Sequence, residues 1–263
     1  MIYSNKELKK QENLKRTISL VTIIAIIIIW FLTTYVFKLI PSLFFPSPID
    51  VFTTLVNVRS TIVSHSLITL YRVIASFGIG SLVGILVGLM MTRFKIVYGF
   101  FNPIIEALRP VPPIALIPFF ILWFGIGDFG KLLLSAIGCF MVMVVNTIEA
   151  VKNVPRIYQQ AAASLGATEG YSYRTVIVPA IVPELISGLR VGLALAFSLV
   201  IAAELMGAQT GIGYLIMVAR RSLNTPTIFL GIIIIGLEAW LMDSLLSSLT
   251  RRLTNWTGRT EGR

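Results

Sequence analysis

The chain has 263 residues, of which 56% are hydrophobic and 13% charged, and its formal net charge is +10. Soluble domains usually contain about 25% charged residues, whereas apolar runs in this chain reach about 20 residues, the length that crosses a bilayer as a helix. The composition therefore excludes an ordinary soluble domain. It predicts an all-α integral membrane protein, because continuous apolar runs favour helices over the alternating strands of a membrane barrel.

Six apolar segments are predicted to span the membrane, at residues 17–37, 66–92, 104–125, 129–151, 183–207 and 227–248. They form one domain over residues 17–250, between a cytoplasmic N-terminal segment at 1–16 and a cytoplasmic tail at 251–263. Lys and Arg are enriched in cytoplasmic loops, and most of them fall on one side when the N-terminus is placed inside. The net charge therefore indicates topology rather than a nucleic-acid-binding surface.

The first span follows a basic stretch, as a signal peptide would. Its apolar run is about 20 residues, however, and the apolar region of a signal peptide is shorter, about 7–15 residues. We therefore expect this span to be retained. After it, Pro41, Pro46 and Pro48 interrupt the helix, and residues 49–63 are expected to resume as a half-amphipathic stretch at the membrane surface.

The second span contains a stripe of glycines. Gly80, Gly84 and Gly88 recur every four residues and so lie on one helical face. Small residues in membrane helices let a neighbouring backbone approach closely. The stripe therefore predicts a tightly packed helix pair.

The third span is rich in proline, and a straight helix cannot pass through it. Its prolines are Pro110, Pro112, Pro113 and Pro118. Broken helices are tolerated in membranes where they face protein or a watery cavity. The segment is either a part of a transport pathway or a cytoplasmic elbow before a shorter span.

A polar stretch at residues 160–179 separates two long apolar segments. It begins with an alanine-rich helix at 161–163, continues through Gly166 and a second polar run, and reaches Pro179. This order predicts a helix, a sharp turn at Gly166, and a second helix that Pro179 ends before the chain re-enters the membrane. A helix pair held outside the bilayer in this way can bind a soluble partner.

This polar stretch resembles the EAA loop of ABC-importer permeases, through Gln160, Ala161, Ala162, Gly166 and Pro179. The sequence differs at the first position, where the family has Glu and this chain has Gln160. Other segments resemble the nitrate/sulfonate/taurine branch of that family. The matching residues are Arg109, Pro110, Pro112, Pro113, Pro118, Trp123, Phe124, Gly125 and Gly127 in the third segment, and Pro183, Gly188, Leu189, Arg190, Ala203, Glu204, Gly211, Gly213 and Ile216 further on.

The resemblance implies a type I ABC-importer permease fold with six transmembrane helices and both termini in the cytoplasm. It implies a homodimer in the plasma (inner) membrane of a bacterium or archaeon. It also implies two cytoplasmic ATPase subunits bound to the coupling loop, residues 152–180, and an extracytoplasmic substrate-binding protein. No cofactor is expected in this chain, because ATP would be bound by the ATPase subunits and the sequence has no P-loop.

The implied substrate is a small anion or sulfonate, such as taurine, another alkanesulfonate, nitrate or bicarbonate. The same machine could instead carry a precursor of thiamine or riboflavin, and the rival class is a stand-alone secondary carrier. No enzyme motif is present. The single Cys139 and the single His65 offer neither a catalytic constellation nor a metal site.

Three residues are candidates for the pathway or its gate. Glu204 lies within the fifth span, where a charge is costly; it either lines the pathway or holds spans together, with Arg72 as a possible partner. Arg190 either attracts an anion or extends toward lipid headgroups. Trp123 either contacts the pathway or serves in packing.

Overall fold

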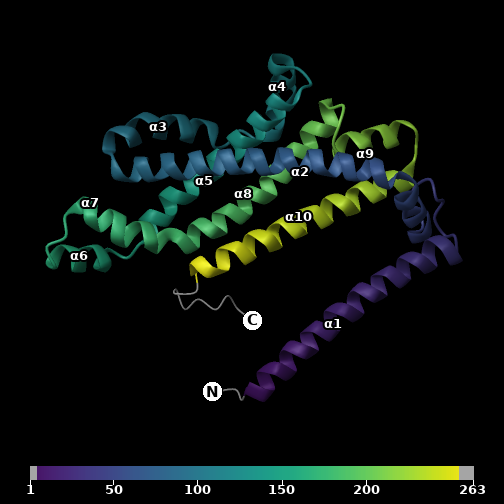
Figure 1. Cartoon of the computed structure of the whole chain (residues 1–263), viewed down its shortest axis with the longest axis horizontal. Helices are drawn as coiled ribbons and strands as arrows, with labels where there is room; N and C mark the ends of the chain where they lie inside the picture. The colour runs from purple at the N-terminus through teal and green to yellow at the C-terminus, as the bar shows by residue number, and fades with distance from the viewer. Residues whose placement is uncertain (1–4, 255–263) are drawn as a thin grey trace.

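The computed structural model describes residues 5–254, and these form helices without any strand (Figure 1). The prediction of an all-α protein is therefore confirmed. The helices are α1 (Asn5–Phe31), α2 (Pro48–Arg93), α3 (Lys95–Leu108), α4 (Ile117–Phe124), α5 (Asp128–Asn153), α6 (Arg156–Ser164), α7 (Glu169–Ser172), α8 (Val178–Gly207), α9 (Ile212–Arg221) and α10 (Thr225–Thr254). Residues 1–4 of the predicted N-terminal segment and 255–263 of the predicted tail lie outside the described residues.

Five helical segments of the described chain are long and apolar enough to cross a bilayer. They are Thr17–Val36, Pro48–Arg93, Asp128–Asn153, Glu169–Gly207 and Thr225–Arg251. A sixth crossing results if the bent pair Lys95–Leu108 and Pro113–Phe124 is one span. The two halves of that pair meet at 83°, because the prolines between them prevent a continuous helix.

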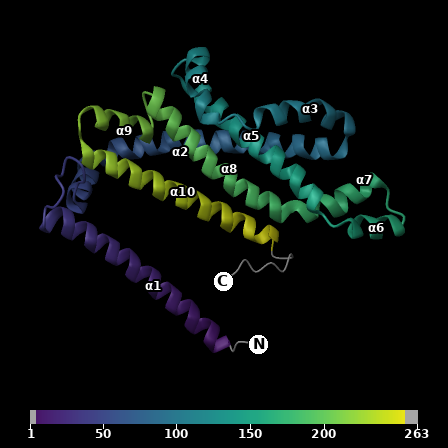
Figure 2. The same ribbon diagram turned by 180° about the vertical axis from the view of Figure 1, so that it is seen from behind.

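Most of the chain is one elongated bundle (Figures 1 and 2). α2, α5, α8 and α10 run along its length, with α6 and α7 at one end and α9 at the other. We call these the α6 end and the α9 end. α1 stands apart from the bundle along most of its length, and only 6% of its most apolar window is buried. Near the α9 end the Trp30 indole N–H donates to the Pro46 carbonyl over 2.9 Å.

α2 is bent at Val58, whose φ of −111° and ψ of 18° are not helical. The arm before the bend begins with a capping box, in which the Ser47 hydroxyl accepts from the Asp50 N–H and the Asp50 carboxylate accepts from the Ser47 N–H. The predicted surface stretch at 49–63 is thus a separate arm only as far as Val58. Beyond the bend the helix continues to Arg93. Val51 of the arm and Ile62 beyond the bend both pack with Leu230 of α10.

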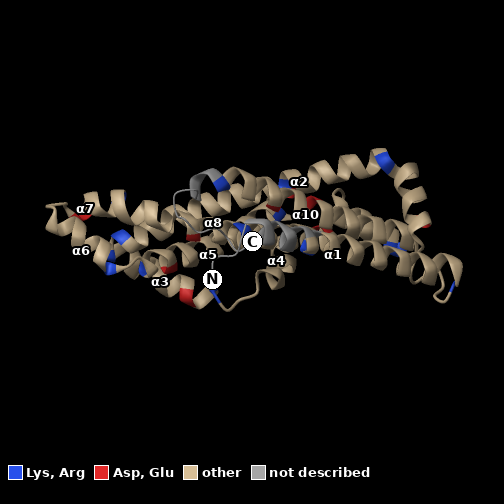
Figure 3. Ribbon diagram, turned by 90° about the horizontal axis from the view of Figure 1, so that it is seen from below, with Lys and Arg blue, Asp and Glu red and all other residues tan. Residues whose placement is uncertain are grey.

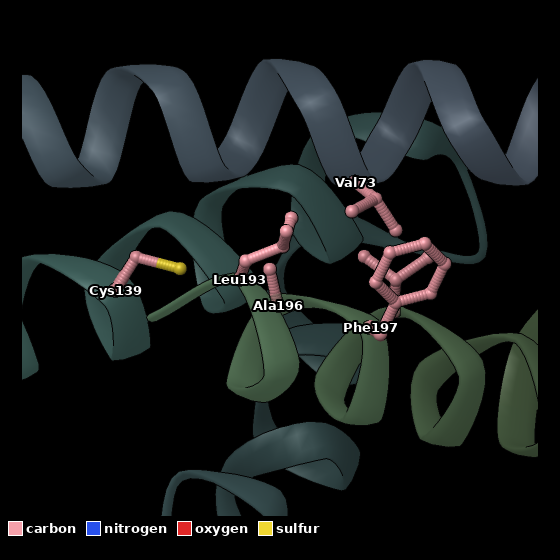
Figure 4. Packing of buried hydrophobic residues seen from close by; sticks show 6 residues of the cluster. Val73, Cys139, Leu193, Ala196 and Phe197 are labelled. Atoms are coloured by element: carbon pink, nitrogen blue, oxygen red, sulfur yellow. The ribbon is translucent and has the colours of Figure 1, made fainter. Parts of the chain in front are cut away.

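The centre of the bundle is the contact of α2, α5 and α8. There Val73 of α2 and Cys139 of α5 meet Ala196 and Phe197 of α8 in an apolar cluster (Figure 4). Charged residues are sparse over the bundle as a whole (Figure 3). The scarcity of charged residues suits a protein whose outer surface faces lipid.

The glycine stripe of α2 faces α5 at very short range. A Cβ at Gly80 would lie 2.2 Å from the Ala136 carbonyl oxygen, and one at Gly84 would lie 2.7 Å from the Phe140 carbonyl oxygen. A Cβ at Gly78, outside the stripe, would meet nothing within 4 Å. The predicted close packing is therefore confirmed, with α5 as the partner helix.

Candidate functional site

The predicted coupling loop, residues 152–180, forms the α6 end of the bundle. No residue of α6 is buried, and Gln160 and Ala161 are both exposed. After α6 the chain turns at Gly166, whose φ of +84° lies in the left-handed region that favours glycine. The Gly166 N–H donates to the Ala163 carbonyl over 2.9 Å. The predicted helix and sharp turn are therefore present.

The prediction that Pro179 ends the second helix is wrong. The chain from Glu169 to Gly207 is one continuous helical segment, and Pro179 lies in the first turn of α8. A π-helical turn at Tyr173–Ile177 precedes it, in which the Val178 N–H donates to the Tyr173 carbonyl. The missing N–H of Pro179 interrupts the regular helical hydrogen bonding at this point, and the π-helical turn directly before it lets the segment continue without a break.

The base of the loop is fixed to the bundle. The Tyr173 hydroxyl donates to the Leu89 carbonyl over 2.9 Å and lies 2.7 Å from the Thr92 hydroxyl. Arg93 Nη1 lies 3.4 Å from Glu169 Oε2. An apolar cluster of Ala150, Val154, Ile177 and Ile181 joins α5 to the start of α8. The exposed α6 is thus carried on a base that contacts α2, α5 and α8.

A second cluster, of buried charges, lies toward the α9 end. Arg72 of α2 and Glu204 of α8 are each 1% exposed, and Arg72 Nη1 donates to Glu204 Oε1 over 2.6 Å. Arg72 also binds Asp128 at the start of α5, with Nη2 and Nε 2.5 and 3.0 Å from Oδ1. One arginine therefore connects three helices.

The chain between α8 and α9 is held against the same cluster by its backbone. The Gly213 N–H donates to Glu204 Oε2, and the Ile212 N–H donates to the Thr69 hydroxyl, each over 2.9 Å. The Gly211 N–H donates to His65 Nδ1 over the same distance. Gly211 has a φ of +106°, and a Cβ there would lie 2.3 Å from the Glu204 carboxylate. We call Arg72, Glu204, Asp128, Thr69 and the 211–213 backbone the charge cluster.

The three pathway candidates are not brought together. Glu204 is enclosed within the protomer and paired with Arg72. This is the arrangement expected of a residue that holds spans together. Arg190, farther along α8 toward the α6 end, forms a two-pronged ion pair with Asp243 of α10, at 2.8 and 2.7 Å. Trp123 is 68% exposed on α4 and packs on Phe119.

Sequence reasoning missed Asp243 and Asp128. Their partners are separated from them by 53 and 56 residues in sequence, and the only available signal was a carboxylate near the end of an apolar run. Among the described residues, no group of three or more His, Cys, Asp or Glu side chains is placed to hold a metal ion.

The chain belongs to the family described as "Binding-protein-dependent transport system inner membrane component", which it matches over residues 80–257. It is therefore a multi-pass membrane protein and a transport component rather than an enzyme, as predicted.

Named relatives agree with this assignment, and a solved structure shares the fold. The chain is 35% identical over 252 residues to the "Taurine transport system permease protein TauC" of Escherichia coli (strain K12), covering 93% of this chain and 91% of that one. It is 33% identical over 219 residues to the "Putative aliphatic sulfonates transport permease protein SsuC" of Bacillus subtilis (strain 168), covering 82% and 79%. An inward-facing structure of the MetNI methionine ABC transporter matches with a TM-score of 0.58 at 21% identity, over 74% of this chain and 98% of that one. This last likeness shows the fold alone.

Proposed function

We propose that this chain is the permease subunit of an ATP-driven importer of small sulfonates such as taurine. Two copies form the translocation pathway, two cytoplasmic ATPase subunits bind their coupling loops, and an extracytoplasmic binding protein delivers the substrate. The substrate class is supported by the taurine and aliphatic-sulfonate permeases that this chain resembles along most of its length.

The observation that carries this proposal is the exposure of α6 on a fixed base. Ile157, Tyr158 and Leu165 are large apolar residues at this end, and Leu165 is 89% exposed. An isolated helix of nine residues is marginally stable in water. A soluble partner that covers α6 would bury these side chains and stabilise the helix.

Movement of α6 can reach the membrane helices through its base. The contacts of Tyr173 with Leu89 and Thr92 join the loop to α2, and the cluster around Ile177 joins it to α5. Closure of the ATPase subunits on ATP would therefore displace these helices together, as rigid-body motion between two packed arrangements. Gln160 is exposed and uncharged, so docking there depends on shape and hydrogen bonding rather than on an ion pair.

The proposed docking places the α6 end in the cytoplasm. Arg93, Lys95, Lys152 and Arg156 all lie at this end, as expected for the cytoplasmic side of a membrane protein. α2 and α10 both run from the α9 end to the α6 end, so the C-terminal end of α10 lies on the same side (Figure 1). Exposed apolar side chains along the helices leave surface for lipid and for the second copy.

Site-specific crosslinking tests the docking. Cys139 is buried, so a cysteine introduced at an exposed position is the accessible thiol among the described residues. Ala161→Cys on α6 is expected to crosslink to the ATPase subunit in membranes that contain the whole transporter. Leu223→Cys, exposed at the α9 end, is the matched control and is expected to give no ATPase adduct. An ATPase adduct from Leu223→Cys alone would refute the proposed docking.

A further inference from the structure

A cavity of about 370 Å³ lies where the break between α3 and α4 faces α5 and α8. This volume is at the lower end of the range for small-molecule sites, about 300–1,000 Å³. Its walls are mainly apolar and include Val142 and Leu195. Three polar side chains line it as well: Arg109 from the break, and Asn146 and Glu149 from α5.

The two charges of the cavity are only loosely paired with each other. Arg109 Nη2 lies 3.6 Å from Glu149 Oε1, which exceeds hydrogen-bond length. Both side chains are more than half exposed. An exposed ion pair of this kind gains little stability in itself, so each charge can bind a group of a ligand instead.

Asn146 adds an acceptor without a donor. Its Oδ1 is buried and has no hydrogen-bond partner among the described residues. The amide fits against α8 because residue 188 is glycine; a Cβ there would lie 2.3 Å from Oδ1. A buried acceptor left without a hydrogen bond destabilises the protein. A turn of this amide toward the cavity would let a ligand N–H satisfy it.

From this arrangement we infer that the cavity is a subsite for a small zwitterion, with an ammonium group at Glu149 and Asn146 and a sulfonate at Arg109. The guanidinium donates to an oxyanion in its preferred planar geometry. The carboxylate of Glu149 and the amide oxygen of Asn146 accept hydrogen bonds, and an ammonium group only donates them. A plain anion would satisfy Arg109 but would leave Glu149 as a repulsive neighbour. The inference rests on the proposed function and narrows its substrate class to aminosulfonates of the taurine type.

Protection of an introduced thiol tests the subsite in the assembled permease–ATPase complex. Val142→Cys places a reactive group in the cavity, and its modification by methyl methanethiosulfonate is timed with added taurine, ethanesulfonate or ethylamine. Taurine is expected to slow the reaction at concentrations about tenfold lower than either analogue, the difference that one charged hydrogen bond provides. Equal protection by taurine and ethanesulfonate would overturn the zwitterion site.

Variants in the Val142→Cys background assign the groups. Glu149→Gln is expected to remove the advantage of taurine over ethanesulfonate, and Arg109→Gln is expected to abolish protection by both. Glu106→Gln, on α3 and not part of the cavity wall, is the matched control and should leave protection unchanged. An unchanged taurine advantage in Glu149→Gln would contradict the inference.

The ATPase activity of the same preparation separates this inference from the proposed function. If the binding protein stimulates ATP hydrolysis but no solute protects the thiol, the subsite is wrong and the permease function stands. If the chain does not assemble with an ATPase subunit, the proposed function fails and the subsite falls with it.

Discussion

The two ends of the bundle differ in how their charged residues are buried and paired. Toward the α9 end, Arg72 and Glu204 are enclosed and bonded to each other and to neighbouring backbone. At the α6 end, Arg93 and Glu169 face each other at 3.4 Å with Glu169 almost fully exposed. The first arrangement fixes helices relative to one another, and the second leaves a surface available to a partner. A subunit that transmits motion needs both features, because a displacement at one end reaches the other only through helices that are firmly joined.

Replacement of Arg72 is expected to have the largest effect on stability. Arg72→Leu leaves the Glu204 carboxylate buried without its counter-charge, and breaking a buried pair in this way costs about 3–5 kcal/mol. The thermal unfolding midpoint of the purified protein in detergent should fall sharply. The double variant Arg72→Leu/Glu204→Leu should recover part of the loss, because it removes the buried unpaired carboxylate, while Asp128 and the Gly213 N–H still lose their partners. A single variant as stable as the parent chain would show that the charge cluster does not join the helices.

Crowding the α2–α5 contact is expected to be the next largest effect. Gly80→Ala places a methyl group too close to the Ala136 carbonyl oxygen, at 2.2 Å, and overpacking of this kind costs about 1–3 kcal/mol. Gly78→Ala is the matched control on the same helix, with open space around the new Cβ; alanine favours helices over glycine by about 1 kcal/mol. The unfolding midpoint should fall for the first variant and hold or rise for the second. Equal midpoints would mean that α2 and α5 separate readily.

These contacts also show what the sequence could predict. Apolar runs of bilayer length predicted the helices, since backbone groups in lipid must be paired within a segment. The four-residue spacing of Gly80, Gly84 and Gly88 predicted a close helix contact, and Gly166 predicted a sharp turn. Each of these signals is local, because helical geometry converts spacing directly into position.

The contacts between residues distant in sequence depend on how the helices pack, and the sequence alone did not predict them. The pairing of Arg190 with Asp243 depends on how α8 and α10 lie side by side, which neither segment encodes alone. The sequence predicts a helix end at Pro179, because nothing in it indicates the π-helical turn that precedes this residue. Glu204 was recognised as costly in lipid, but whether it faced a pathway or a partner depended on where Arg72 would lie.

The turn at Gly166 is expected to affect coupling more than stability. Gly166→Val puts a β-branched residue at a φ of +84°, where non-glycine residues lose about 1–2 kcal/mol and branched ones are rare. The protein should insert normally, while uptake and stimulation of ATP hydrolysis by the binding protein decrease. Gly166→Asn is the control, because asparagine tolerates left-handed angles, and should retain most activity. Full uptake by Gly166→Val would refute the requirement for this bend.

The smallest effect is expected at the exposed ion pair of the α6 end. Arg93→Gln removes the contact with Glu169, and pairs of this exposure contribute about 0–1 kcal/mol. The unfolding midpoint should barely change, and the small difference should vanish at high salt, which screens exposed charges. The charge-swapped variant Arg93→Glu/Glu169→Arg should match the parent chain. If Arg93→Gln lowered the unfolding midpoint as much as Arg72→Leu, the ion pair at the α6 end would fix helices as firmly as the charge cluster does. The contrast between a buried cluster that joins helices and an exposed surface for a partner would then be wrong.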